Sequence, residues 1–190
     1  MVKVSLPVAV AIAPAAAKHA DNITLTGTNL DLVRKVYFNN VPVAITEFVS
    51  QTATQLVIKV PAAATKGKLK LEAASGVQTE SATELDLVMP AITAMNPNPV
   101  EPGANFTITG TNLNLVTAIL FENVTNAVTG FVSQSATQII VKIPAGIANG
   151  LVTLRVANSS LTVQSANVLT IAGAAPPPTI ALHLYNDALV

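Results

Sequence analysis

The chain has 190 residues, of which 51% are hydrophobic and 11% charged, and ten basic residues balance ten acidic ones. This composition supports domains with buried cores, and it lacks the basic surface that nucleic-acid binding requires. Because the chain contains no cysteine, disulfides and thiolate metal sites are excluded. We therefore expect folded domains with no nucleic-acid partner.

The N-terminal stretch supports two interpretations. Lys3, an apolar run and the small residues 15–17 are typical of a secretory signal peptide. Shifted by 83 positions, however, Leu6-Pro7 falls on Met89-Pro90, so the same stretch aligns with the opening strand of a second repeat. We favour the strand, and assign residues 1–6 to the closing strand of a preceding domain or, alternatively, to the start of a signal peptide.

The offset of 83 positions runs through most of the chain. Residues 22–30 (NITLTGTNL) return as residues 105–113 (NFTITGTNL). Between residues 27–62 and 110–145 the register holds without a gap, and 21 of 36 positions are identical. A period of this length is enough for a small domain with its own core. The sequence thus predicts two tandem domains, residues 7–89 and 90–174.

Each repeat alternates short β-rich runs with turn residues and shows no helical stripe. The strands expected in the second repeat are residues 91–95, 105–109, 117–121, 127–132, 138–143, 151–157 and 167–171. Alternation along them places Phe106, Ile108 and Val141 toward the core and Lys142 outside. Seven strands in one period are typical of an immunoglobulin-like sandwich. The predicted fold is all-β, with two tandem immunoglobulin-like β-sandwiches joined by short linkers.

The repeated residues have structural explanations. We expect Gly27 and Gly110 in the turn after the second strand, followed by asparagines in the left-handed conformation. Pro61 and Pro144 are expected to end a strand because proline cannot donate to a ladder. The expected core anchors are the phenylalanines Phe38, Phe48, Phe121 and Phe131.

These residues resemble the IPT/TIG domain, an immunoglobulin-like module found in plexins, transcription factors and bacterial surface proteins. The second repeat carries the pattern at Pro102, Gly103, Ile108, Gly110, Asn112, Phe121, Asn123, Thr137, Gln138, Pro144 and Gly150. The first repeat departs from it with His19-Ala20 in place of Pro102-Gly103. The resemblance covers about residues 7–174 and implies the fold, whereas the family hosts many functions.

The tail does not repeat. Residues 174–178 (AAPPP) form a stiff spacer, and the alternation of Ile180, Leu182 and Leu184 predicts a strand, so we assign residues 175–190 to a linker and the first strand of a further module. Residues 184–189 (LYNDAL) resemble the first strand of the glycan-binding module in surface glycan-binding proteins of Bacteroidota polysaccharide-utilisation systems. Those lipoproteins carry IPT-like sandwiches as spacers. The alternative is an unrelated linker and strand.

Catalysis has little support in the sequence. The chain has two histidines, His19 in an unpaired turn and His183 in the tail, so a nucleophile lacks an evident base. Acidic positions are not repeated, since Asp31 becomes Asn114 and Glu47 becomes Gly130. We expect no enzymatic activity, no cofactor and no metal.

Sugar recognition commonly uses exposed aromatic rings. The chain has no tryptophan, and the ligand-binding candidates are Tyr37 and Tyr185. The resemblance implies a cell-surface, outer-membrane lipoprotein that binds polysaccharide or oligosaccharide through sequence beyond residue 190, with an outer-membrane transport complex as a further partner. Two alternatives remain: accessory domains of a secreted glycoside hydrolase, and a surface adhesin or structural filament.

Overall fold

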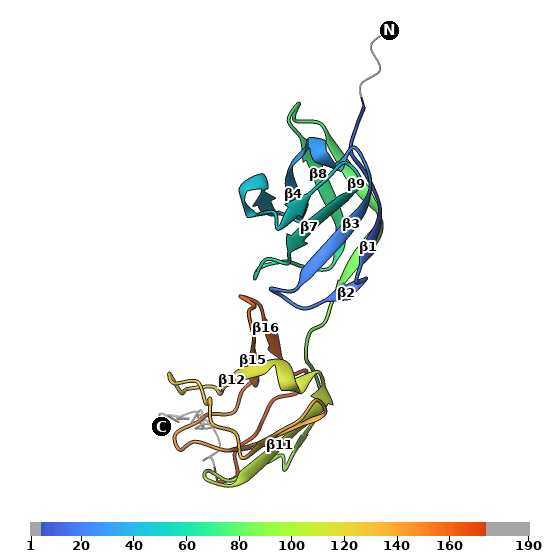
Figure 1. The fold of residues 1–190 in the computed structure, drawn as a ribbon. Helices are drawn as coiled ribbons and strands as arrows, with labels where there is room; N and C mark the ends of the chain where they lie inside the picture. Colours follow the sequence, from blue (N-terminus) through green and yellow to red (C-terminus); the bar gives the residue numbers. More distant parts are fainter. Residues whose placement is uncertain (1–4, 174–190) are drawn as a thin grey trace, which may run out of the picture.

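The computed structural model describes residues 5–173, which form two β-sandwiches arranged end to end (Figure 1). Each sandwich has its own cluster of buried side chains, drawn from residues 9–85 in the first and 100–171 in the second. The all-β prediction with two tandem immunoglobulin-like sandwiches is confirmed. Among residues 5–173, none of the helical segments has the length and hydrophobicity of a membrane-spanning helix.

The first sandwich contains two sheets, with strand orders β1-β3-β7-β6 and β2-β9-β8-β4-β5. Its strands are β1 (Val8–Ala13), β2 (Ala16–Ala17), β3 (Asn22–Thr28), β4 (Val33–Phe38), β5 (Val41–Ala44), β6 (Ser50–Gln51), β7 (Gln55–Lys59), β8 (Gly67–Ala73) and β9 (Gln78–Leu87). Two short 3-10 helices, η1 (Leu30–Leu32) and η2 (Ile45–Glu47), lie between strands. The stretch that the sequence left open between strand and signal peptide contains β1, which pairs antiparallel with β3. Residues 1–4, which belong to the segment assigned to the closing strand of a preceding domain, lie outside the described residues.

The second sandwich has the sheet orders β10-β11-β14-β13 and β12-β15-β16. Its elements are β10 (Ala91–Asn96), β11 (Asn105–Thr111), η3 (Leu113–Leu115), β12 (Val116–Leu120), β13 (Ser133–Gln134), β14 (Gln138–Lys142), β15 (Thr153–Val156) and β16 (Thr162–Gln164). Five expected strands are confirmed within a few residues. The strands expected at 127–132 and 167–171 are wrong, because single bridges replace them, and β16 was not predicted.

The missing strand after β12 has a local cause. In the first sandwich the Glu47 carboxylate accepts a hydrogen bond from the Ala44 amide (3.0 Å) and closes η2 behind β5. The second repeat has Gly130 at that position, so this cap is lost. Pairing also moves: Val36 faces Val43 in the first sandwich, whereas Ile119 faces Val128, two positions later in the repeat. Residues 121–132 therefore form a wider irregular loop.

The alternation predicted for the cores is confirmed. Phe106, Ile108 and Val141 are fully buried, whereas Lys142 is exposed. Phe121 is buried, and its ring meets that of Phe106 edge to face, with centroids 6.4 Å apart. Phe38 is also buried, while Phe48 and Phe131 are half-buried against the two clusters. The phenylalanines are core residues, although two of them retain an exposed edge.

The expectation that Gly27 and Gly110 lie in turns is wrong. Gly27 lies within β3, where a Cβ would overlap the carbonyl oxygen of Val8, and Gly110 lies within β11, against the carbonyl of Ala91. A register shift between Ala9 and Ala11 brings the strand backbones this close. The left-handed positions follow, at Asn29 (φ = 54°) and Asn112 (φ = 51°), as expected.

Candidate functional site

The joint between the sandwiches is held by hydrogen bonds from both of them. Three residues, Val88, Met89 and Pro90, separate β9 from β10. The Val88 amide donates to the Ala17 carbonyl in the first sandwich (2.9 Å), and the Met89 carbonyl accepts from Asn112 Nδ2 in the second (3.0 Å). Pro90 is buried and has a fixed φ. Each linker residue is thus held by one sandwich or the other.

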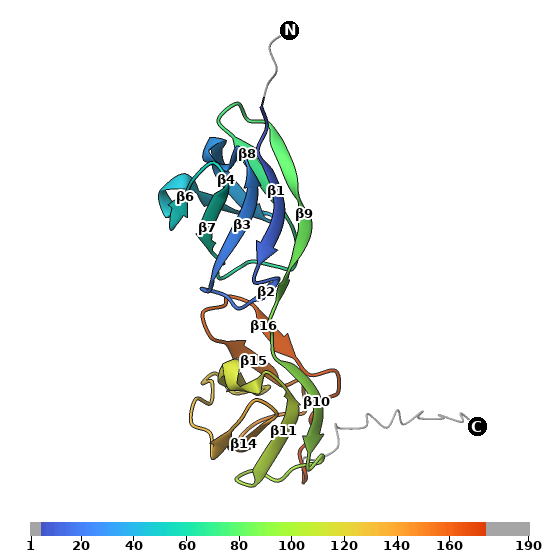
Figure 2. The ribbon, with the colours of Figure 1, turned by 45° about the vertical axis from the view of Figure 1, so that its right-hand side comes forward.

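A second contact lies on the side of the joint where the β15–β16 tip meets the β2 end of the first sandwich (Figure 2). The Ser160 amide donates to the Ala62 carbonyl oxygen at 2.9 Å, and Ser160 Oγ approaches the same oxygen at 3.2 Å. Ser159 Oγ lies 3.4 Å from it. Two separate attachments, the linker and this tip, fix the relative orientation of the sandwiches better than a linker alone.

His19 lies beside this joint and is not the unpaired turn residue that the sequence suggested. Its side chain is 2% exposed, and Nε2 donates to the Ala64 carbonyl oxygen at 3.0 Å. The adjacent Ala20 takes the left-handed conformation (φ = 69°), as Gly103 does in the second repeat (φ = 79°). His19 therefore stabilises the first turn where Pro102-Gly103 does so in the second sandwich.

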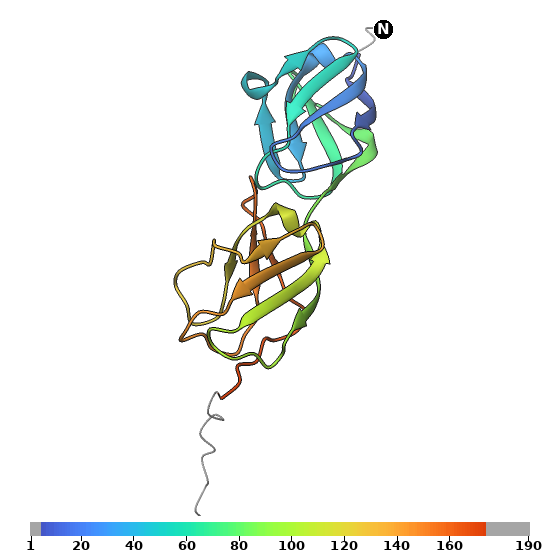
Figure 3. The same cartoon turned by 60° about the horizontal axis from the view of Figure 1, so that its bottom comes forward.

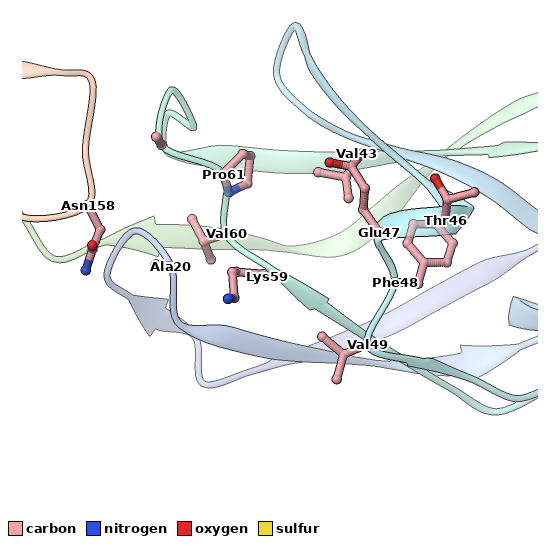
Figure 4. Close-up of a pocket in the computed structure, with 11 residues that line it drawn as sticks. Ala20, Val43, Thr46, Glu47, Phe48, Val49, Lys59, Val60, Pro61 and Asn158 are labelled. Carbon is pink, nitrogen blue, oxygen red and sulfur yellow. The ribbon is translucent and has the colours of Figure 1, made fainter.

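A hollow of about 520 Å³ opens next to the joint (Figure 4). The side chains of Phe48, Val49 and Pro61 contribute to its apolar surface, and Lys59 and Glu47 add charged groups. Asn158 reaches its edge from the second sandwich, as the close-up shows. Its volume lies within the range of small-ligand sites, which are commonly apolar with a few polar groups.

Tyr37 lies on β4, and its hydroxyl is already engaged. Tyr37 Oη donates to the Glu72 carboxylate (2.8 Å), which also accepts from Gln78 Nε2 (2.9 Å) and lies 3.4 Å from Lys35 Nζ. Hydrogen bonds from Gln78 and Tyr37 lower the pKa of Glu72, and the bond to Glu72 raises the pKa of Tyr37. The half-buried ring is thus fixed within a polar network on the strand.

The structure describes one of the two predicted ligand-binding residues, Tyr37. Tyr37 has no aromatic counterpart, because the second repeat carries Leu120 there. Tyr185 and His183 lie outside the described residues. Within residues 5–173 no three histidine, aspartate or glutamate side chains gather in a metal-binding arrangement.

Sequence reasoning missed the residues of the joint. Asn112 was interpreted as a turn residue, yet its side chain also holds the linker carbonyl. A signal was present, since an asparagine follows the motif glycine by two positions and a proline precedes the first strand in both repeats. The role of Ser160 had no such signal, because the first repeat has Val77 at that position.

Comparisons with known proteins agree with this architecture. The IPT/TIG domain model matches residues 7–84 and 90–171. No curated protein matches the chain. Among solved structures, the chain is similar to the surface glycan-binding protein SGBP-B of the Bacteroides ovatus mixed-linkage glucan utilisation locus, in complex with a heptasaccharide (17% identity, TM-score 0.38, 87% of this chain and 45% of that one).

Two further structures show the breadth of this likeness. The surface glycan-binding protein PbSGBP-B of Prevotella bryantii is 16% identical with a TM-score of 0.39, covering 88% of this chain and 43% of that one. The plexin A4 extracellular region is 20% identical with a TM-score of 0.41, covering 87% and 18%. The chain spans less than half the length of each of the three. The two family matches span most of the sequence, so the protein belongs to the IPT/TIG domain family.

Proposed function

We propose that the two sandwiches are the rigid spacer of a non-enzymatic glycan-binding protein at the cell surface, anchored in the outer membrane. The observation that carries the spacer role is the joint, where the Met89 carbonyl is held by Asn112 and the Ala62 carbonyl by Ser160. Flexible linkers lack such attachments, and domains joined by them move relative to one another. The joint here favours one orientation.

The end-to-end arrangement suits this role, because the sandwiches extend the chain along one direction (Figure 3). The glycan assignment rests on the resemblance of residues 184–189 to the first strand of a glycan-binding module. A distal module of that kind would be held away from the membrane by the spacer. Polysaccharide or oligosaccharide is then bound beyond residue 190, and Tyr185 belongs to that module; a transport complex in the outer membrane is a further partner.

One observation favours a second function. The hollow beside Phe48 and Val49 gives the sandwiches an apolar surface of their own, as an adhesin requires. In that case Tyr37 is an additional contact residue, on β4 beside the strand β5 that contributes Val43 to the hollow. The accessory-domain alternative instead requires a hydrolase active site elsewhere in the protein.

Affinity electrophoresis in polysaccharide-containing gels separates these functions. We would compare residues 1–190 with the protein isolated from its cells, and measure released reducing sugar for both. The proposal predicts retardation of the isolated protein alone, without sugar release. Retardation of residues 1–190 would instead support the adhesin, and sugar release by the isolated protein would support the hydrolase.

A further inference from the structure

The segment that leads into the first sandwich makes the same contacts as the linker that leads into the second. Asn29 Nδ2 donates to the Leu6 carbonyl at 3.1 Å, as Asn112 Nδ2 donates to the Met89 carbonyl at 3.0 Å. Pro7 is buried, as Pro90 is. The segment that enters the first sandwich is therefore held on the same path as the linker, although within residues 5–173 no domain precedes it.

A second hydrogen bond also holds this segment. Thr79 Oγ1, on β9, donates to the Pro7 carbonyl oxygen at 2.7 Å. The carbonyls of Leu6 and Pro7 are thus each fixed by a side chain from a different strand region of the first sandwich. The path of Leu6 and Pro7 is therefore set by their contacts with the sandwich.

The surface beside this segment corresponds to the β15–β16 tip, which forms the second contact of the joint. The tip between β8 and β9, residues 74–77, is the counterpart of residues 157–160, whose Ser160 amide donates to Ala62. Val77 is 42% exposed, and its amide has no acceptor within residues 5–173. The first sandwich thus presents a donor and an apolar side chain where the second sandwich makes its contact.

We propose that this entrance face, defined by Leu6, Asn29 and residues 74–77, docks a further sandwich of the same family that lies upstream in the same polypeptide. This inference rests on the proposed spacer function and extends it. The upstream unit presents a carbonyl in the position of Ala62 to the Val77 amide, and its closing strand leads into the segment held by Asn29. Its continuity with the observed joint selects this occupant.

The equivalence with the joint favours a covalently linked occupant, because Asn29 holds the entering chain as Asn112 holds the linker from the preceding sandwich. A second, separate copy could reach the 74–77 tip, but it would have no linker carbonyl to offer in place of Leu6. The Leu6 contact is already made within the chain. The geometry therefore favours an array in one polypeptide over head-to-tail association of separate chains.

Spin-label distance measurements test the inference. Because the chain has no cysteine, Gln55→Cys and Gln138→Cys provide labels at equivalent exposed strand positions. The reference is this pair in the 190-residue chain. The test chain carries a second copy of residues 7–89, a sandwich with its own core, inserted before Pro7, with Gln55→Cys in both copies.

We expect the test pair to give one narrow distance distribution close to that of the reference. Asn29→Gly in the original, downstream sandwich keeps the left-handed backbone but removes the amide that would hold the new linker, so the narrow peak should be lost while the melting temperature shows that the fold persists. A narrow reference with a broad test pair would overturn the inference and leave the spacer standing. A broad reference would overturn both.

Association of separate chains is read independently from the molar mass at rising concentration. The inference predicts a monomer throughout. Concentration-dependent head-to-tail oligomers of the 190-residue chain that are abolished by Val77→Asp would assign the entrance face to a second copy and so contradict the inference.

Discussion

Gly27 allows two paired strands to approach closely, because it has no side chain. The backbone of β1 approaches β3 at the register shift after Ala9, and the Val8 carbonyl occupies the space of a Cβ. We expect Gly27→Ala to lower the free energy of unfolding by about 3 kcal/mol, the upper end of the range for overpacked sites. Gly130→Ala is the matched control, since its Cβ meets nothing within 4 Å. Equal urea midpoints for the two variants would contradict this explanation.

A second residue-scale prediction concerns Glu72. Because Gln78 and Tyr37 lower its pKa in the folded protein, ionised Glu72 stabilises the fold above its unfolded pKa of about 4.3, and this contribution is lost as the pH falls through the lower folded value. Glu72→Gln should therefore unfold at lower urea concentration than the parent at pH 7, with the difference shrinking below about pH 4.

The control for that experiment is Glu80→Gln on β9, whose carboxylate accepts no hydrogen bond within residues 5–173. A difference between parent and Glu72→Gln that stays constant from pH 7 to acid would show that packing, not ionisation, explains the effect. The stability contribution of Tyr37 depends on pH in the opposite direction. Its raised pKa favours the protonated hydroxyl, so the contribution is lost as the pH rises through the pKa of the folded state.

At the scale of elements, one glutamine holds a 3-10 turn in each sandwich. Gln134 Nε2, on β13, donates to the carbonyls of Leu113 and Val116, both at 2.8 Å, and Gln51 does the same for Leu30 and Val33. These bonds connect β13 to the start of β12. Besides pairing with β14 and β7, the two-residue strands β13 and β6 thus hold the 3-10 turn of their sandwich through a side chain.

We expect Gln134→Ala to destabilise the second sandwich by about 1–3 kcal/mol, because it leaves two carbonyls without their donor. Gln138→Ala, on β14, is the control, since its exposed side chain makes no hydrogen bond within residues 5–173. Urea unfolding of each variant gives the comparison. If Gln138→Ala lowered the free energy of unfolding as much as Gln134→Ala does, the hydrogen bonds of Gln134 to the 3-10 turn could not explain the loss.

The sequence predicted elements where the two repeats agree and failed where they differ. Alternating apolar residues located β11 and β14 because both cores need them. Residues 127–132 have an equally strand-like pattern. However, Gly130 stands where the first repeat has Glu47, so the carboxylate that closes the equivalent segment is missing. The joint could not be predicted, since Asn112 and Ser160 act on carbonyls from other parts of the fold.

At the scale of the whole molecule, the joint depends on hydrogen bonds to backbone carbonyls. The two ion pairs within residues 5–173, Lys35–Glu72 and Lys66–Asp86, both lie inside the first sandwich. Salt screens exposed charges strongly at about 1 M. We therefore expect small-angle X-ray scattering to give the same maximum dimension at low salt and at about 1 M salt. A salt-dependent dimension would show that charges hold the sandwiches.

The most direct measurement is the distance distribution between spin labels at Gln55→Cys and Gln138→Cys in the 190-residue chain. The rigid-spacer account predicts one narrow peak, because linker and tip attach the sandwiches at two places. Inserting Gly-Ser-Gly between Met89 and Pro90 should broaden it, whereas the same insertion after the exposed Thr125 should not. A broad distribution in the parent chain, unchanged by the linker insertion, would contradict the account.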